Sequence, residues 1–174
     1  MAVSSSRVFW VDKHGESIHS ANMDGTDQKV VAPSPEGNWV HRLQADDNHG
    51  YGSGGESTSG GLNRAPVGGG TKTQLSTSGW MTFALQDGTI FGLCTGQLMR
   101  INADGTGQTV LTSMADGAWG LFVDSQIFWG TMCNGGSDCN KSWRAEKDGS
   151  GVTTVNSFGA SGAYVADADS LYMP

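Results

Sequence analysis

Hydrophobic and polar residues along this chain follow the pattern of short β-strands. Apolar or alternating runs last only a few residues, as in Val8–Val11 and Gly117–Asp124. Clusters rich in Gly and Asp separate these runs, as expected for tight turns. No segment sustains the apolar period of an amphipathic helix. The pattern therefore predicts an all-β fold with no helix of consequence.

One unit of this pattern recurs along the chain. Four segments align without a gap, and each ends in an Asp-Gly or Gly-Gly turn: 17–26, 61–70, 97–106 and 141–150. A short β-prone run such as Lys29–Val31 follows the turn. Asp-Gly between two such runs predicts a hairpin, because Gly adopts positive φ without steric cost. Each unit is therefore expected to end in a hairpin.

Two sets of aromatic residues mark the other strands of the unit. The first set opens an apolar or alternating run: Trp39, Trp80, Trp119 and Tyr164. The second set begins the next short strand: Phe9, Tyr51, Phe91, Phe128 and Tyr172. The unit then reads as strands a, b and c, a tight turn, and strand d, in roughly 40 residues.

Four short antiparallel strands at this period are typical of a β-propeller blade. We predict a single β-propeller domain over 1–174, built of about four four-stranded antiparallel blades. The repeats are approximately 1–36, 37–77, 78–115 and 116–160, with a partial repeat at 161–174. In this interpretation the chain starts at strand b, Val8–Val11, and the Gly-rich segment 50–61 is a surface loop. Closure is expected either from the C-terminal strand or from a second chain in a homodimer, because open sheet edges associate.

The segment Ile18–Val31, preceded by Phe9–Asp12, resembles the YWTD repeat of low-density-lipoprotein-receptor propellers. The Arg position of those repeats recurs at Arg64, Arg100 and Arg144, with Ser20 as the exception. The resemblance covers nearly the whole chain and implies fold more than function. It departs from the family in size, since those propellers have six blades. A looser resemblance is to small lectin propellers, which repeat a sugar pocket in each blade.

Charge and cysteine content narrow the function classes. The net charge is −7 with ten scattered Lys and Arg residues, which argues against nucleic acid or anionic lipid as a partner. No apolar run is long enough to span a bilayer, and no signal segment precedes Arg7, so a cytoplasmic or leaderless-secreted protein is expected. Cys94, Cys133 and Cys139 are an odd number, and the last two are either a small disulfide ring or reduced thiols.

The inner-strand aromatics and the loops near them are the candidate binding surface. In a propeller the d-to-a and b-to-c connections emerge on one face, close to the start of strand a. The candidate ligand-binding residues are Trp39, Trp80, Trp119, Tyr164, His41, Arg42, Asn134 and Asp138. Aromatic planes beside polar loops suit a sugar. The alternative is that these rings only pack one blade on the next.

No catalytic or metal signature emerges, so no enzyme activity and no cofactor are expected. The Asp-Gly turns lack the alternating acidic ligands that calcium requires. Asp46-Asp47 lies near an a-to-b turn, on the wrong face for a glycosidase pair. The Arg residues are expected to be buried against a carboxylate such as Asp87 or Asp124. The leading hypothesis is a non-enzymatic, multivalent lectin, and the alternative is a scaffold that binds a protein or peptide.

Overall fold

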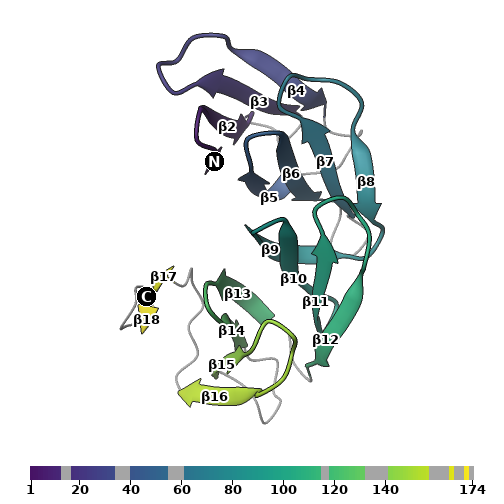
Figure 1. Ribbon diagram of the computed structural model, residues 1–174, viewed down its shortest axis with the longest axis vertical. Coiled ribbons are helices and arrows are strands. Elements are labelled where there is room, and N and C mark those ends of the chain that lie inside the picture. The colour runs from purple at the N-terminus through teal and green to yellow at the C-terminus, as the bar shows by residue number, and fades with distance from the viewer. Residues whose placement is uncertain are drawn as a thin grey trace. The chain divides into compact units, whose positions relative to one another are not determined.

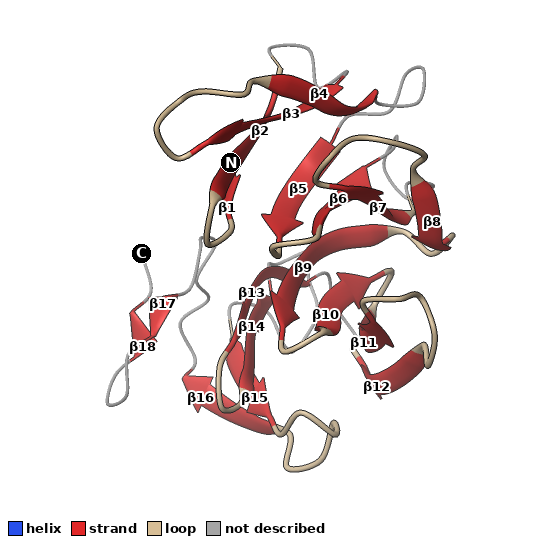
Figure 2. Cartoon of the chain, turned by 45° about the horizontal axis from the view of Figure 1, so that its top comes forward, coloured by secondary structure: helices blue, strands red, loops and turns tan. Residues whose placement is uncertain are grey.

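The computed structural model describes residues 1–12, 17–33, 40–54, 61–114, 118–131, 141–156, 165–166 and 171–172. Every regular element within these ranges is a β-strand (Figure 2). The strands form four four-stranded antiparallel sheets and one two-stranded sheet. The all-β, propeller-type fold predicted from the sequence is confirmed. No described helix is long and apolar enough to cross a membrane.

The chain divides into two compact units, Met1–Met81 and Thr82–Pro174, and β9 crosses the boundary between them. The first sheet is β1 (Ala2–Val3), β2 (Arg7–Val11), β3 (Ser17–Asn22) and β4 (Lys29–Pro33). The second sheet is β5 (Val40–Ala45), β6 (His49–Gly54), β7 (Leu62–Pro66) and β8 (Thr73–Ser76). Within each sheet the strands follow chain order, as the repeat predicts (Figure 1).

The third sheet is β9 (Trp80–Gln86), β10 (Thr89–Cys94), β11 (Gln97–Asn102) and β12 (Thr109–Ser113). The fourth sheet is β13 (Ala118–Val123), β14 (Ile127–Thr131), β15 (Ser142–Ala145) and β16 (Thr153–Asn156). A final hairpin consists of β17 (Val165–Ala166) and β18 (Leu171–Tyr172).

Two details of the strand assignment differ from the sequence-based prediction. The chain starts with a short strand a, since β1 pairs with β2 and completes the first sheet. Its two residues carry too little pattern to be recognised. Residues 50–54 are not loop, because they belong to β6, which pairs with β5 and β7. A Cβ on Gly50 would lie 3.6 Å from Phe9, and one on Gly52 3.5 Å from Ile18; both are ordinary contact distances, so this strand packs directly on the first sheet.

The register defines two faces in every sheet. The aromatic residue near the start of the second strand lies opposite one residue of the third strand: Phe9 opposite Ser20, Tyr51 opposite Arg64, Phe91 opposite Arg100, and Phe128 opposite Arg144. We call the face that carries this pair face A and the opposite face face B. Because side chains alternate along a strand, the residues next to the pair lie on face B.

Face A of one sheet packs on face B of the next within each unit. In the first unit, Phe9 and Ile18 from face A of the first sheet pack with Ala65 from face B of the second. In the second unit, Phe91 and Leu93 pack with Trp129 from face B of the fourth sheet. The same stacking direction in both units is what a radial arrangement of blades requires.

Each outer strand contains a β-bulge at the same position. The pairing of the third with the fourth strand shifts register once in all four sheets. The extra residue is apolar each time: Val31, Leu75, Leu111 and Val155. A bulge re-aims a side chain and twists an exposed edge away from pairing with another chain. Val31 is accordingly part of the core of the first unit.

Two glycines of the hairpin turns give a matched stability test. Gly149 has φ of 88°, and a Cβ there would lie 2.7 Å from the Leu111 carbonyl oxygen. Gly25 has φ of 82° with nothing within 4 Å of the same position. We expect Gly25→Ala to lower the free energy of unfolding by about 1 kcal/mol through φ alone. Gly149→Ala should cost roughly 2 kcal/mol more, because backbone atoms must move. Urea denaturation of both variants measures the two losses. Equal losses of unfolding free energy would contradict the close approach of Leu111 to Gly149.

Candidate functional site

The candidate site lies where the inner strand of a sheet begins. In β5, Val40 pairs with Gly54 and Arg42 pairs with Ser53, so His41 is an extra residue in a bulge. In β13, Ala118 pairs with Thr131 and Gly120 with Gly130, which leaves Trp119 as the extra residue. Bulges of this kind redirect a side chain and are frequent beside functional sites. The same device therefore occurs in β5 and in β13.

This register corrects the alignment of the inner-strand aromatics. Sequence comparison placed Trp39 in line with Trp119, whereas the bulges place His41 in line with Trp119. The Asp that follows each inner strand would have revealed the correspondence between His41 and Trp119. His41 and Trp119 each precede that residue, Asp46 or Asp124, by five positions. Trp39 and Trp119 were aligned because both are tryptophans. The pairing of β5 with β6 and of β13 with β14 shows that they occupy different positions of the strand.

The structure describes only part of the predicted site. Arg42 is exposed beside the bulge in β5. Trp80, at the start of β9, is 2% exposed, and its indole Nε1 has no hydrogen-bond partner among the described residues. The backbone of His41 and Trp119 is described, but their side chains lie outside the described part. Trp39, Tyr164, Asn134 and Asp138 also lie outside it, as do Cys133 and Cys139.

Hydrogen bonds between Thr131 and Lys141 join the end of β14 to the residue before β15. The Thr131 amide donates to the Lys141 carbonyl oxygen at 3.0 Å, and the Lys141 amide donates to Thr131 Oγ1 at 3.4 Å. These bonds lie next to the bulge at Trp119, because Thr131 pairs with Ala118. The corresponding connection between β10 and β11 is only the turn Thr95-Gly96. Loops of different length at the same end of a common framework are typical of a binding face.

A buried hydroxyl marks the same end of the second sheet. Ser53 is fully buried opposite Arg42, and its Oγ has no hydrogen-bond partner in the described structure. An unsatisfied buried hydroxyl costs about 1–3 kcal/mol, so such groups are uncommon unless they serve a purpose. Sequence analysis did not identify Ser53, because a serine in a Gly-rich segment carries no signal of burial.

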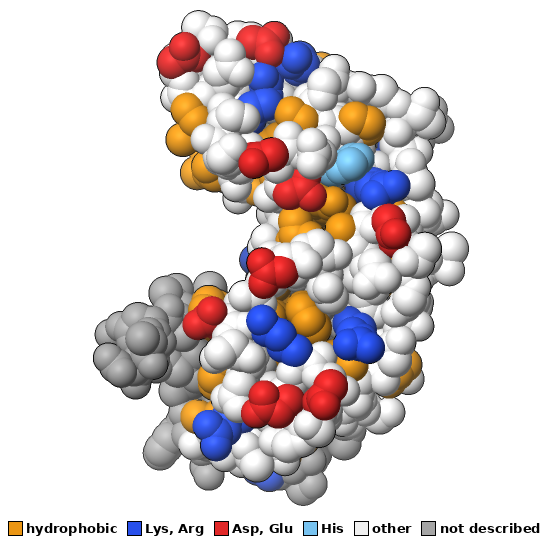
Figure 3. Space-filling view, viewed as in Figure 1, with side chains coloured by type: hydrophobic (Ala, Val, Ile, Leu, Met, Phe, Trp, Pro, Cys, Tyr) orange, Lys and Arg blue, Asp and Glu red, His pale blue; other side chains and the backbone are white. Residues whose placement is uncertain are grey.

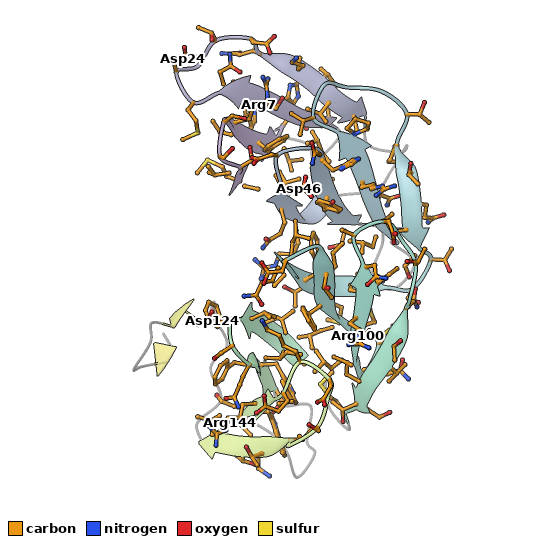
Figure 4. The ribbon with its side chains drawn as sticks, in the orientation of Figure 1. Arg7, Asp24, Asp46, Arg100, Asp124 and Arg144 are labelled. Carbon is orange, nitrogen blue, oxygen red and sulfur yellow. The ribbon has the colours of Figure 1, made fainter. Side chains whose placement is uncertain are left out.

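At the opposite end of the second sheet, the carboxylates of Asp46 and Asp47 have structural roles. Asp46 Oδ1 accepts from the amides of Asn48 and His49, each at 2.7 Å, and Oδ2 accepts from the Tyr51 hydroxyl at 2.7 Å. Asp47 accepts from the amide and hydroxyl of Ser5, in the turn between β1 and β2 of the first sheet. Both carboxylates are thus occupied in turn capping and sheet-to-sheet contacts. Figure 4 labels Asp46 in this turn.

Tyr51 gives a prediction for alkaline pH. Burial, together with the adjacent Asp46 carboxylate, raises the pKa of Tyr51 far above its ordinary value. The fold therefore favours the neutral phenol. Its stabilising contribution is complete below the ordinary tyrosine pKa of about 10 and is lost as the pH rises above it. We expect the free energy of unfolding of the wild type to fall above that pH more steeply than that of Tyr51→Phe. Urea titrations at neutral and alkaline pH compare them, and parallel curves would refute the assignment.

The structure corrects part of the prediction that the repeated Arg residues, Arg64, Arg100 and Arg144, are buried. Arg100 and Arg144 are exposed rather than buried, because long side chains on the third strand reach solvent. Arg144 Nε donates to Thr153 Oγ1 at 3.2 Å. Hydrogen bonds from Ser150 lower the pKa of Asp148, and the charge of Arg100 adds to this effect. The charge of Arg100 thus acts on Asp148 of the fourth-sheet turn, and Figure 4 shows Arg100 well apart from Asp124.

In the first sheet, where Ser20 replaces the Arg, another arginine fills the place. Arg7 is 7% exposed and donates from Nε and Nη2 to Ser20 Oγ, at 3.2 and 3.0 Å. Its Nη1 donates to Asn22 Oδ1 at 2.7 Å and to Asp27 Oδ2 at 2.8 Å. Arg7 thus joins β2, β3 and the turn before β4.

The Asp-Gly turns hold their own carboxylates. Asp24 Oδ1 accepts from the amide and hydroxyl of Thr26, at 2.9 and 2.6 Å. Asp104 and Thr106 repeat the arrangement at 2.8 and 2.7 Å. These are turn-stabilising bonds. Among the residues that the structure describes, no group of three or more His, Cys, Asp or Glu could hold a metal ion. Cys94 is buried in β10, and burial raises the pKa of its thiol to about 12.

Comparison with known proteins supports the architecture. No family model matches the chain, and no curated protein matches it in sequence. The structure is similar to a chain in the crystal structure of a nidogen/laminin complex, with a TM-score of 0.67, 14% identity, and coverage of 90% of this chain. It is also similar to oligogalacturonate lyase in complex with manganese, with a TM-score of 0.62, 14% identity and 86% coverage.

These similarities establish a propeller fold and no more. The chain spans 61% of the nidogen/laminin chain and 50% of the lyase chain. Of these two structures, one is an enzyme and the other is a complex of two proteins, so shared architecture does not distinguish catalysis from binding. The YWTD character of the repeats stays a resemblance seen in the sequence.

Proposed function

We propose that this chain is a protein-binding propeller that uses the starts of its inner strands and the adjacent loops. The observation that carries the proposal is the bulge repeated in β5 and β13, with His41 or Trp119 as the extra residue. Arg and Trp are the residue types most enriched among energetically important interface residues. The nidogen/laminin structure, in which a similar propeller chain occurs in a complex of proteins, is consistent with this function.

The charge distribution favours recognition by individual residues. On the face drawn in Figure 3, basic and acidic side chains are interspersed. An acidic group of a partner would then pair with a single cation such as Arg42, which is exposed at the bulge. Arg offers a planar set of donors that suits a carboxylate.

Carbohydrate binding is the second candidate. A sugar needs an accessible aromatic plane, and Trp80 is only 2% exposed. That burial supports the packing interpretation of Trp80. For the lectin hypothesis the relevant residue is Trp119, because it is the extra residue of the bulge in β13.

One experiment separates the two functions. The purified chain is screened against a displayed random-peptide library and against a glycan array. We expect peptide binders whose affinity falls about tenfold in Arg42→Glu, which corresponds to losing roughly 1.4 kcal/mol. Arg144→Glu is the matched control, since it reverses an exposed Arg on β15, and it should leave affinity unchanged. Glycan binding that free sugar inhibits, or peptide binding insensitive to Arg42→Glu, would overturn the proposal.

A further inference from the structure

The turn between β9 and β10 differs from the other Asp-Gly turns that the structure describes. Asp87 and Gly88 form the whole connection from Gln86 to Thr89. Both have positive φ, 49° and 73°, a conformation that an L-residue such as Asp rarely adopts. Both are exposed, and a Cβ on Gly88 would meet nothing within 4 Å. The turn is therefore open to water, and its backbone is unfavourable for Asp87.

The turn at Asp24 restrains the two groups that make an Asp-Gly pair chemically labile. Such a pair is labile because the glycine amide nitrogen can attack the carboxyl carbon of the aspartate side chain. Here the Gly25 amide donates to the Asn22 carbonyl oxygen at 2.9 Å. Asp24 Oδ1 accepts from the Thr26 amide, also at 2.9 Å. The hydrogen bonds from Thr26 lower the pKa of Asp24, which disfavours the neutral acid that reacts.

The turns at Asp104 and Asp148 repeat this arrangement. In each, the amide of the following glycine donates to the carbonyl oxygen three residues earlier, at 2.8 and 2.9 Å. Each carboxylate also accepts from the backbone amide two residues later, at 2.8 Å. Among the described residues, by contrast, neither the Asp87 carboxylate nor the Gly88 amide has a hydrogen-bond partner. Asp87-Gly88 is thus the described pair in which both reacting groups are available.

We propose that Asp87-Gly88 is a modification site at which the folded chain forms isoaspartate with water as the only co-reactant. The Gly88 nitrogen forms a bond to Asp87 Cγ and loses its proton, while the side-chain hydroxyl takes up a proton and leaves as water. The product is a cyclic succinimide. Water then adds to one of its two carbonyl carbons, and the bond from that carbon to the ring nitrogen breaks. Breaking at Cγ restores aspartate, whereas breaking at the α-carbonyl carbon leaves the main chain running through the side chain.

Isoaspartate lengthens the two-residue turn by one backbone carbon. A two-residue turn with positive φ at both positions matches the twist of the strands that it joins, and a longer one does not. The Ala103 amide donates to the Gly88 carbonyl oxygen at 2.8 Å, so the same turn also holds the start of the connection from β11 to β12. We therefore expect modified chains to unfold at a lower temperature than unmodified ones.

The test is incubation of the folded full chain in water labelled with heavy oxygen, because each succinimide that hydrolyses takes one oxygen atom from the solvent. Tryptic cleavage in ordinary water then places Asp24, Asp87 and Asp148 on separate peptides, 14–29, 73–100 and 148–174. Fragment masses locate the label within each peptide. We expect Asp87 to gain label at least about tenfold faster than the other two, which corresponds to a barrier lower by roughly 1.4 kcal/mol. Synthetic peptides of the three sequences should gain label at similar rates, because they lack the folded turns.

Asp87→Glu is the matched variant, because it keeps the carboxylate but would have to close a larger ring, which forms far more slowly. Circular dichroism first verifies that the variant folds. After the same incubation, the wild type should show a population with lowered Tm, and Asp87→Glu should not. Labelling of Asp87 no faster than that of Asp24 and Asp148 in the folded chain overturns the proposal. The same ranking in the synthetic peptides does so as well, because the local sequence rather than the folded turn would then set the rate.

Discussion

Replacing Trp129 with Ala is expected to lower the free energy of unfolding by about 3–5 kcal/mol, the usual cost of truncating a buried large aromatic residue. Trp129 is 1% exposed, lies among Phe91, Leu93 and Ile127, and stacks on Trp143. Its removal takes contacts from two sheets at once and leaves a cavity between them. Because small domains are stable by only about 5–15 kcal/mol in total, this single change is severe.

Trp10→Ala is the matched control for this prediction. It removes the same residue type from the same position of the repeat, on a face that is partly exposed. In dilute solution its cost should be no more than about 1 kcal/mol, the range of a partly exposed site. Urea denaturation followed by circular dichroism measures both variants. Equal losses for Trp10→Ala and Trp129→Ala would show that sheet-to-sheet burial does not set the energetics.

Replacing Arg7 with Met is expected to lower the free energy of unfolding by roughly 2 kcal/mol, since buried hydrogen-bond partners lose their donor. Ser20 is fully buried and receives two of the Arg7 hydrogen bonds. Met keeps most of the apolar part of the side chain. The loss of unfolding free energy therefore measures the contribution of the guanidinium group rather than that of packing. The ion pair with Asp27 adds little, because that side chain is 52% exposed.

Arg144→Met is the control for the Arg7 variant. Arg144 is exposed and makes a hydrogen bond to Thr153, so its loss should stay within about 0.5 kcal/mol. Thermal unfolding of the two variants at matched pH and salt gives the comparison. If Arg7→Met were as mild as Arg144→Met, the network around Ser20 would be incidental. A combined Arg7→Met, Ser20→Ala variant that recovers stability would indicate that the stranded hydroxyl causes the loss.

The candidate site was less predictable than the fold. Sequence patterns placed it near the start of the inner strands and included His41 and Arg42, but matched Trp39 to Trp119. Bulges in β5 and β13 produce the true correspondence, and a bulge depends on pairing between strands rather than on the order of residues. Ser53 was missed for a similar reason, because burial of a serine depends on what packs above it.

The sequence by itself determined the all-β class, the four-strand unit and the hairpin turns. These features are local: alternation sets the strand, and Asp-Gly followed by Thr or Ser sets the turn, as the contacts of Asp24 and Asp104 demonstrate. Tertiary structure decided that residues 50–54 form a strand packed on Phe9, and that Arg7 supplies the guanidinium that Ser20 cannot. It also decided that Trp129 is buried while Trp10 is not. Those outcomes depend on which residues pack against each side chain in space, and a local sequence pattern does not contain that information.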